Sequence, residues 1–205
     1  MKNNKIIAWL FTPFRFIAGR SALICGIFII ALLSVLGYLS NTYFDGIIDI
    51  HIGCPDMTYP YIVHAFFQLL TWVLLTVVFY ITARIVTKTS VRIIDIAGTM
   101  ALAQTPLLFA ALVGFIPALH VCLGDIDTIN LGQMMETIED NIIPLIIAGI
   151  IFFIFCVWSI LLRYNAYSVS ANVKGAKGII SFIIALFICE VLSKLLIYFI
   201  LPLLI

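Results

Sequence analysis

The stretch NIIPLIIAGIIFFIFCVWSILL, residues 141–162, contains no Asp, Glu, Lys or Arg. An α-helix rises 1.5 Å per residue, so about 20 apolar residues cross a bilayer core about 30 Å thick. This stretch is long enough and almost wholly apolar, which predicts a transmembrane helix. It lacks the apolar–polar alternation of membrane barrel strands, so a barrel is not expected.

Four other stretches have the same character. Residues 21–44, 57–83 and 96–124 are free of charge, and residues 178–205 are interrupted only by Glu190 and Lys194. Each stretch is long enough to cross the bilayer as a helix. We therefore expect an all-α integral membrane bundle of five transmembrane helices that forms one domain, residues 1–205. The predicted spans cover residues 21–40, 62–83, 96–119, 141–162 and 179–204.

The composition agrees with a membrane protein. Apolar residues make up 64% of the 205 residues and charged residues only 10%, and the mean hydropathy is +1.22. Soluble domains carry about 45–50% apolar and about 25% charged residues. A chain of this size cannot bury so much apolar surface in water. A water-soluble enzyme, a nucleic-acid-binding protein and a disordered linker are therefore excluded.

The distribution of basic residues predicts the orientation, because short loops rich in Lys and Arg stay in the cytoplasm. Basic residues lie before the first span and after the second and fourth, where Arg163 begins the connection. The connections after the first and third spans have none and hold most acids. We expect a cytoplasmic N-terminus and anionic lipid headgroups as partners of the inner face. The basic candidates of the inner connections are Arg84, Lys88, Arg92, Lys174 and Lys177.

The segment IIAWLFTPFRFI, residues 6–17, precedes the first span. It is too short to cross the membrane and is interrupted by Pro13, but its aromatic residues and Arg15 are typical of a short helix in the cytoplasmic interface. A cytoplasmic extension of the first span is an equal alternative. A cleaved signal peptide is a third interpretation of residues 1–40, although the apolar run is longer than usual for one.

The third span differs from the others in its small residues. Ala97, Ala101 and Thr105 repeat at a spacing of four, as do further small residues toward Gly114. Such rows let helices approach closely, so we expect this span at the centre of the bundle. Pro106 removes one backbone hydrogen bond beside Gln104. This favours either a broken helix that lines a substrate site or a kink that neighbouring helices satisfy.

Glu190 and Lys194 lie inside the fifth span, four residues apart, with the acid first. This order favours a helical ion pair. Charges within the membrane cost free energy, so each must be paired, protonated or in contact with water. The alternatives are a proton or ion relay and a structural role within the bundle.

The outer connections hold two cysteines and two histidines, as HIGC (51–54) and HVC (120–122). A Cys54–Cys122 disulfide is one interpretation, and free thiols are another. A zinc site from His51, Cys54, His120 and Cys122 is a weaker candidate, because neither spacing matches a zinc signature and no metal is expected.

The order of these features resembles the Yip-domain family, named for interaction with Ypt/Rab GTPases. FTPFRF (11–16) is similar to the family's aromatic lead, and residues 92–106 with LVGFIP (112–117) to its small-residue helix. RYNAYSVSANVKGAKG (163–178) is similar to its polar turn between spans four and five. The chain lacks the Asp-Leu-Tyr-Gly-Pro segment and long cytoplasmic region of eukaryotic members. The resemblance therefore implies a short bacterial-type member in the inner membrane.

Two functions follow as hypotheses. The first is a non-enzymatic protein that binds or organises other membrane proteins or itself, through its bundle and basic inner loops. The second is a small transporter or channel subunit with Gln104, Pro106, Glu190 and Lys194 near the pathway. No nucleophile–base, Walker, dinucleotide or HExxH motif is present, so neither an enzyme nor a cofactor is expected.

Overall fold

The computed structural model describes residues 3–54, 58–87, 90–121 and 131–205. Within these described residues, five helical segments are long and apolar enough to cross a membrane. The prediction of an all-α, five-span bundle is thereby confirmed. The spans are α2 (Gly19–Leu39), α3 (Tyr61–Val86), the broken pair α4 (Ile93–Leu102) and α5 (Thr105–Val113), α7 (Ile142–Ser170) and α8 (Gly175–Ile200).

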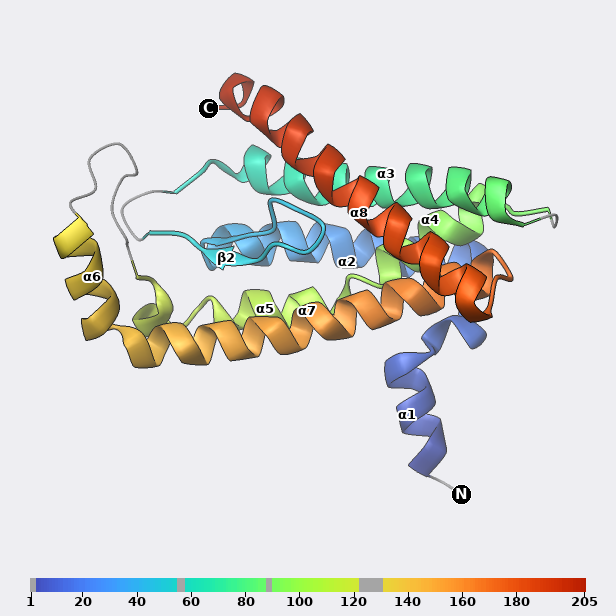
Figure 1. Ribbon diagram of the computed structural model, residues 1–205, viewed down its shortest axis with the longest axis horizontal. Coiled ribbons are helices and arrows are strands. Elements are labelled where there is room, and N and C mark those ends of the chain that lie inside the picture. Colours follow the sequence, from blue (N-terminus) through green and yellow to red (C-terminus); the bar gives the residue numbers. More distant parts are fainter. Residues whose placement is uncertain (1–2, 55–57, 88–89, 122–130) are drawn as a thin grey trace.

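The spans run side by side with alternating direction, and α8 crosses the others obliquely (Figure 1). One end of the bundle holds the start of α2, the α3–α4 connection and the α7–α8 connection. We call it the basic end, because Arg20 at the start of α2, Arg84 at the end of α3, and Lys174 and Lys177 beside the α7–α8 connection lie there. The opposite end holds the α2–α3 and α5–α7 connections.

The third span lies at the centre, as its small residues predict. It is the most buried of the five candidate spans. A Cβ atom on Gly98 of α4 would lie 2.6 Å from the backbone nitrogen of Leu23 in α2. Gly26 of α2 packs in the same way against Ala101 of α4. Only glycine permits these approaches, so the α2–α4 contact depends on backbone-to-backbone packing.

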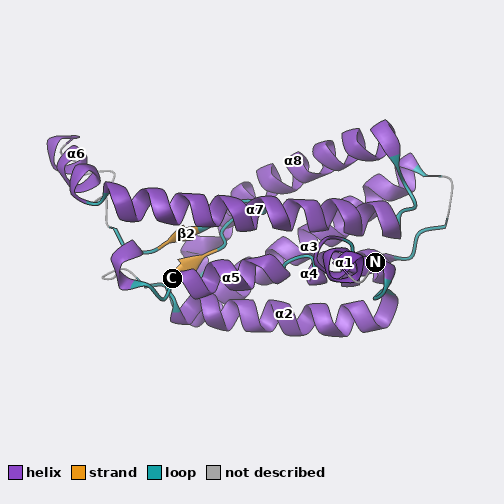
Figure 2. Ribbon diagram, turned by 90° about the horizontal axis from the view of Figure 1, so that it is seen from below, coloured by secondary structure: helices purple, strands orange, loops and turns teal. Residues whose placement is uncertain are grey.

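The N-terminal segment forms α1 (Asn3–Phe11), which Figure 2 views end-on, so that it runs across the bundle axis. A short 3-10 helix, η1 (Pro13–Arg15), follows and buries Phe14. The indole of Trp158 in α7 donates a hydrogen bond to the Leu10 carbonyl at 3.0 Å. α1 crosses the bundle axis with Trp9 and its apolar neighbours exposed, as expected of a helix that lies in the membrane interface. Its placement in that interface stays a prediction.

The remaining elements are short and lie toward the opposite end. They are β1 (Thr42–Tyr43), β2 (His51–Ile52), η2 (Pro117–Leu119), α6 (Leu131–Asp140) and η3 (Leu201–Leu203). The two strands pair antiparallel, with Thr42 opposite Ile52 and Tyr43 opposite His51. The segment that this hairpin encloses carries the candidate site.

Candidate functional site

The α2–α3 connection does not stay outside the bundle. Between β1 and β2, residues 44–50 (FDGIIDI) turn back among the helices, and we call them the inserted loop (Figure 1). Its apolar side chains Phe44 and Ile47 are only 4% and 2% exposed. The sequence analysis assigned this stretch to the connection after the first span. The loop instead brings its backbone and two acids against α7 and α8.

Glu190 of α8 receives the backbone of the inserted loop. Its Oε2 accepts hydrogen bonds from the N–H groups of Ile47 at 2.8 Å and Ile48 at 3.1 Å. Backbone N–H groups without a partner are costly where water is excluded. The carboxylate therefore satisfies two donors that the loop could not pair within itself.

Lys194, one helical turn further along α8, neutralises the acids of the inserted loop. Its Nζ lies 3.5 Å from Oδ2 of Asp45 and forms an ion pair with Asp49. The sequence spacing favoured a pair between Lys194 and Glu190 on the same helix. In the structure both side chains have the inserted loop as their partner, so the two intramembrane charges act together as an anchor for it.

Close approach at Gly46 makes this anchor tight. A Cβ atom at this position would lie 2.8 Å from Oε1 of Glu190 and 3.3 Å from Cε of Lys194. Real Cβ atoms essentially never come within 3.0 Å of another heavy atom. A side chain at position 46 therefore requires the carboxylate of Glu190, the movable end of its side chain, to shift away from the inserted loop.

Arg163 is a site residue that sequence reasoning missed. The charge-free run ends at Leu162, so Arg163 was assigned to a cytoplasmic connection, but α7 continues to Ser170. Its side chain is 1% exposed and donates through Nη1 to the Ile47 carbonyl at 2.5 Å. Its Nε and Nη2 have no hydrogen-bond partner in the described part of the chain.

Gln104 and Pro106 form the break in the third span. Pro106 stands in the first turn of α5 and cannot donate to the Leu102 carbonyl, but the Thr105 hydroxyl donates to that oxygen at 2.6 Å. The Leu102 carbonyl thus has a donor within the third span itself, whereas the kink interpretation expected donors from neighbouring helices. Gln104 itself is fully buried, and among the described residues neither atom of its amide has a partner. Among the described residues, neither Gln104 nor Pro106 forms a hydrogen bond with the inserted loop.

The basic candidates lie apart from the inserted loop, at the basic end. Arg84, Arg92, Lys174 and Lys177 are exposed, and Lys88 lies outside the described residues. Arg92 donates from Nε to Oδ2 of Asp95 at 2.8 Å. This hydrogen bond raises the pKa of Arg92 above its ordinary value. The other three make no ion pair within the part of the chain that the structure covers.

The outer histidines are engaged in fold contacts. His51 lies 3.4 Å from Asp45, and the two ring nitrogens of His120 lie 2.9 Å and 2.7 Å from the carbonyl oxygens of Gly53 and Gly114. Cys54 takes part in a disulfide, whereas Cys25, Cys156 and Cys189 are free. The residue predicted to pair with Cys54, Cys122, lies outside the described residues. The Cys54–Cys122 disulfide and the weaker zinc candidate that shares Cys122 therefore stay predictions.

Five apolar spans with charges enclosed among them define a multi-pass membrane protein of the all-α class. The model of the Yip1 domain matches residues 18–196, which is most of the chain. The chain therefore belongs to the Yip1-domain family, as the resemblance in its sequence indicated. Comparison with curated proteins and with solved structures found no match.

Proposed function

We propose that this chain is a non-enzymatic binding or organising component of a bacterial inner (plasma) membrane. In this proposal the basic end faces the cytoplasm, and the exposed cations there contact other membrane proteins, a second copy of this chain and anionic lipid headgroups. The orientation follows from the positive-inside pattern of the connections. The bundle serves as the rigid support for that surface.

One observation carries the proposal: the intramembrane charges of α8 are already committed to the inserted loop. Glu190 accepts from the loop backbone, and Lys194 is paired with Asp45 and Asp49. A substrate pathway needs polar groups that are free to exchange partners. By contrast, Arg84, Lys174 and Lys177 are exposed and make no ion pair with any described residue. Exposed cations without an ion-pair partner among the described residues therefore lie at the basic end.

A second candidate function is a small transporter or channel subunit that uses Gln104, Glu190 and Lys194. The observation that favours it is the group of buried polar atoms without partners, namely the Gln104 amide and two nitrogens of Arg163. Such atoms inside a membrane bundle mark sites where water or a polar substrate enters. This candidate requires flux, whereas the first requires a partner.

Purification from native membranes at the endogenous level, in mild detergent with mass spectrometry of bound proteins, tests the proposal. Arg84→Gln combined with Lys174→Gln and Lys177→Gln is the test variant, and Gln104→Leu is the control for the alternative. We expect a near-stoichiometric partner, or a stable homo-oligomer, that the triple variant loses and Gln104→Leu keeps. Loss with Gln104→Leu only, together with flux in reconstituted vesicles, contradicts the proposal and supports the transporter.

A further inference from the structure

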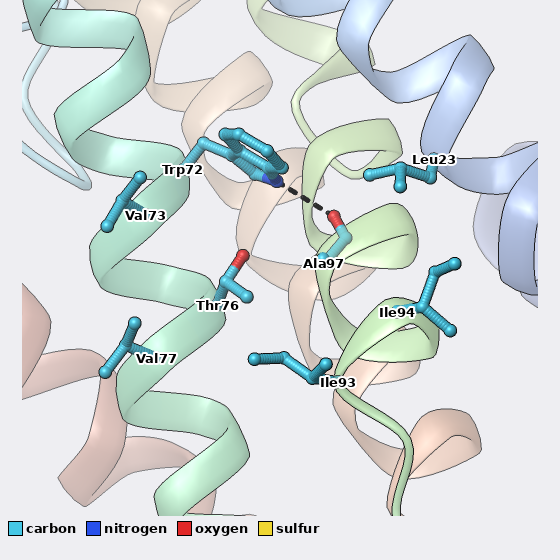
Figure 3. Close-up of a pocket in the computed structure, with 8 residues that line it drawn as sticks. All are labelled: Leu23, Trp72, Val73, Thr76, Val77, Ile93, Ile94 and Ala97. Atoms are coloured by element: carbon cyan, nitrogen blue, oxygen red, sulfur yellow. Dashed lines mark hydrogen bonds between the residues drawn. The ribbon is translucent and has the colours of Figure 1, made fainter.

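The hollows of the described surface differ in the polar groups that they offer. A groove between α3 and α4 is lined mainly by apolar side chains, and its indole, Trp72, already donates to the Ala97 carbonyl at 2.9 Å (Figure 3). A second hollow, of about 270 Å³, lies at the opposite end of the bundle and is bordered by Gly114 and His120. The second hollow gives water access to a histidine that takes no part in anchoring the inserted loop.

The ring of His120 joins the α2–α3 connection to the end of the third span. Its Nδ1 lies 2.9 Å from the carbonyl oxygen of Gly53, directly after β2, and its Nε2 lies 2.7 Å from that of Gly114, at the end of α5. Both glycines are buried, and among the described residues no backbone N–H donates to either oxygen. Buried carbonyl groups need a donor, so the imidazole ring has two acceptors to satisfy.

This geometry decides which protonation state of the ring fits. A neutral imidazole has one N–H donor and one nitrogen with a lone pair, whereas the imidazolium has two N–H donors. A carbonyl oxygen can only accept, so neutral His120 satisfies one of its two oxygens and turns a lone pair toward the other. The imidazolium satisfies both. Histidine is also the side chain that ordinarily gains and loses its proton between about pH 5 and about pH 8.

Titratable groups on the neighbouring elements face other partners. Tyr43 of β1 donates to the Asn41 side chain, and His51 of β2 is paired with an acid of the inserted loop. Tyr38, at the end of α2, packs edge-on against Tyr61. Of the eight residues that line the hollow, His120 alone has a titratable side chain, and the first half of α7 has none. The acids of α6, which form no ion pair with His120 within the described residues, are Glu136, Glu139 and Asp140, and Asp56, Asp125 and Asp127 lie outside those residues.

From this geometry we infer that His120 is a proton-binding site that ties the two connections of the opposite end together. With the proton bound, the ring holds Gly53 and Gly114 at once, and loss of the proton releases one of them. We call this arrangement the His120 clasp. The Gly53 N–H donates to the Asn41 carbonyl at 2.7 Å, so the clasp also bears on the hairpin that encloses the inserted loop.

The clasp makes the opposite end sensitive to the pH of the compartment that it faces. In the orientation of the proposed function, that compartment lies outside the cytoplasm, and the inference rests on the proposed function for this side alone. Acid closes the clasp, and alkali opens one of its two contacts. A ring nitrogen must lose its proton to bind a metal ion, so the closed clasp and a zinc ion on His120 exclude each other.

Nuclear magnetic resonance of the purified chain in lipid nanodiscs, with isotope-labelled histidine and glycine, measures the clasp. The signals of His120 are assigned by their loss in His120→Gln or, where that variant does not fold, by elimination with His51→Gln and His64→Gln. We expect both ring nitrogens to be protonated at about pH 5. As the pH rises to about 8, the carbonyl signal of Gly53 or Gly114 should shift along the same titration curve as the ring. A ring that loses its proton without a change at either carbonyl would overturn the inference.

Thermal unfolding provides a second readout. The folded state holds the proton through both contacts, so its stability should fall as the pH rises through the titration of the ring. The comparison is made in a His51→Gln background, where the pair with Asp45 does not contribute. From about pH 5 to about pH 8, this background should lose about 2–4 °C more in melting temperature than the same background with His120→Gln, as one lost hydrogen bond predicts.

An equal loss with and without His120→Gln would overturn the inference, and so would one zinc ion bound per purified chain. The resonance measurement on the unaltered chain decides the matter even where the variants unfold. Both measurements use the purified chain alone. Their failure is therefore distinguishable from failure of the partner purification, which tests the proposed function.

Discussion

Oε2 of Glu190 accepts a hydrogen bond from the backbone N–H of Ile47 at 2.8 Å across a separation of 143 residues. The bond joins the fifth span to the connection after the first. It converts a costly intramembrane charge into the acceptor for an inserted loop. The structural role of Glu190 is thus visible in a single contact.

Replacement of Glu190 tests this role. Glu190→Leu leaves the N–H groups of Ile47 and Ile48 without their acceptor, so we expect the free energy of unfolding to fall by about 2–4 kcal/mol. Glu190→Gln keeps an acceptor oxygen, and its loss should be about half as large. Unfolding in detergent, followed by circular dichroism, measures both. Glu136→Gln, on the exposed surface of α6, is the control, and an equal effect of Glu136→Gln and Glu190→Leu would refute the role.

Gly46 offers a steric test of the same contact. Gly46→Ala places a Cβ atom 2.8 Å from Oε1 of Glu190, so the carboxylate must shift and its hydrogen bonds to the inserted loop weaken; we expect a loss of about 1 kcal/mol in unfolding free energy. A Cβ atom on Gly149 of α7 meets nothing within 4 Å, so Gly149→Ala should not destabilise the helix. Thermal unfolding of the two variants separates them. Equal melting temperatures would mean that the Glu190 carboxylate moves aside without cost, which contradicts a stabilising hydrogen bond between Glu190 and the inserted loop.

Lys194 and Asp49 should be energetically coupled. In a double-mutant cycle with Lys194→Met and Asp49→Asn, we expect a coupling free energy of about 0.5–1 kcal/mol, because both side chains are partly exposed. The cycle is measured by chemical unfolding in detergent. A parallel cycle with Lys177→Met and Asp49→Asn provides the baseline. Zero coupling in both cycles would contradict the ion pair.

Gln104 should behave as a buried amide without a partner. Gln104→Leu removes unpaired polar atoms from the bundle, so we expect unfolding free energy that is unchanged or higher by about 1 kcal/mol. Thermal unfolding in the same detergent measures this. A loss of stability above about 1 kcal/mol would show that the amide has a bonded partner.

The sequence predicted the number of spans, because length and hydropathy decide whether a helix can cross a bilayer. The central third span was also predictable, since the spacing of Ala97 and Ala101 reports close helix packing directly. The inserted loop was not predictable in this way. Asp45 and Asp49 look like the acids of an outer connection, and nothing local in the sequence indicates a partner in α8. Only the apolar residues around Gly46 gave a signal for burial.

Arg163 shows a second reason why the structure differs from the sequence-based prediction. A charge ends an apolar run, and the sequence analysis ended the fourth span at Leu162 for that reason. The helix continues to Ser170 and ends where Asn172 adopts a left-handed backbone conformation, with φ 51°. Arg163 is tolerated inside because the Ile47 carbonyl of the inserted loop accepts from it. The contact with the inserted loop therefore holds Arg163 inside the bundle, although the local sequence pattern had assigned this residue to a connection.

The most direct test of the account is amide hydrogen exchange at Ile47 and Ile48 in lipid nanodiscs. The account predicts slow exchange of both amides in the unaltered chain, and exchange at least about tenfold faster in Glu190→Leu. Fast exchange of both amides in the unaltered chain, at the same rate as in Glu190→Leu, would contradict the account.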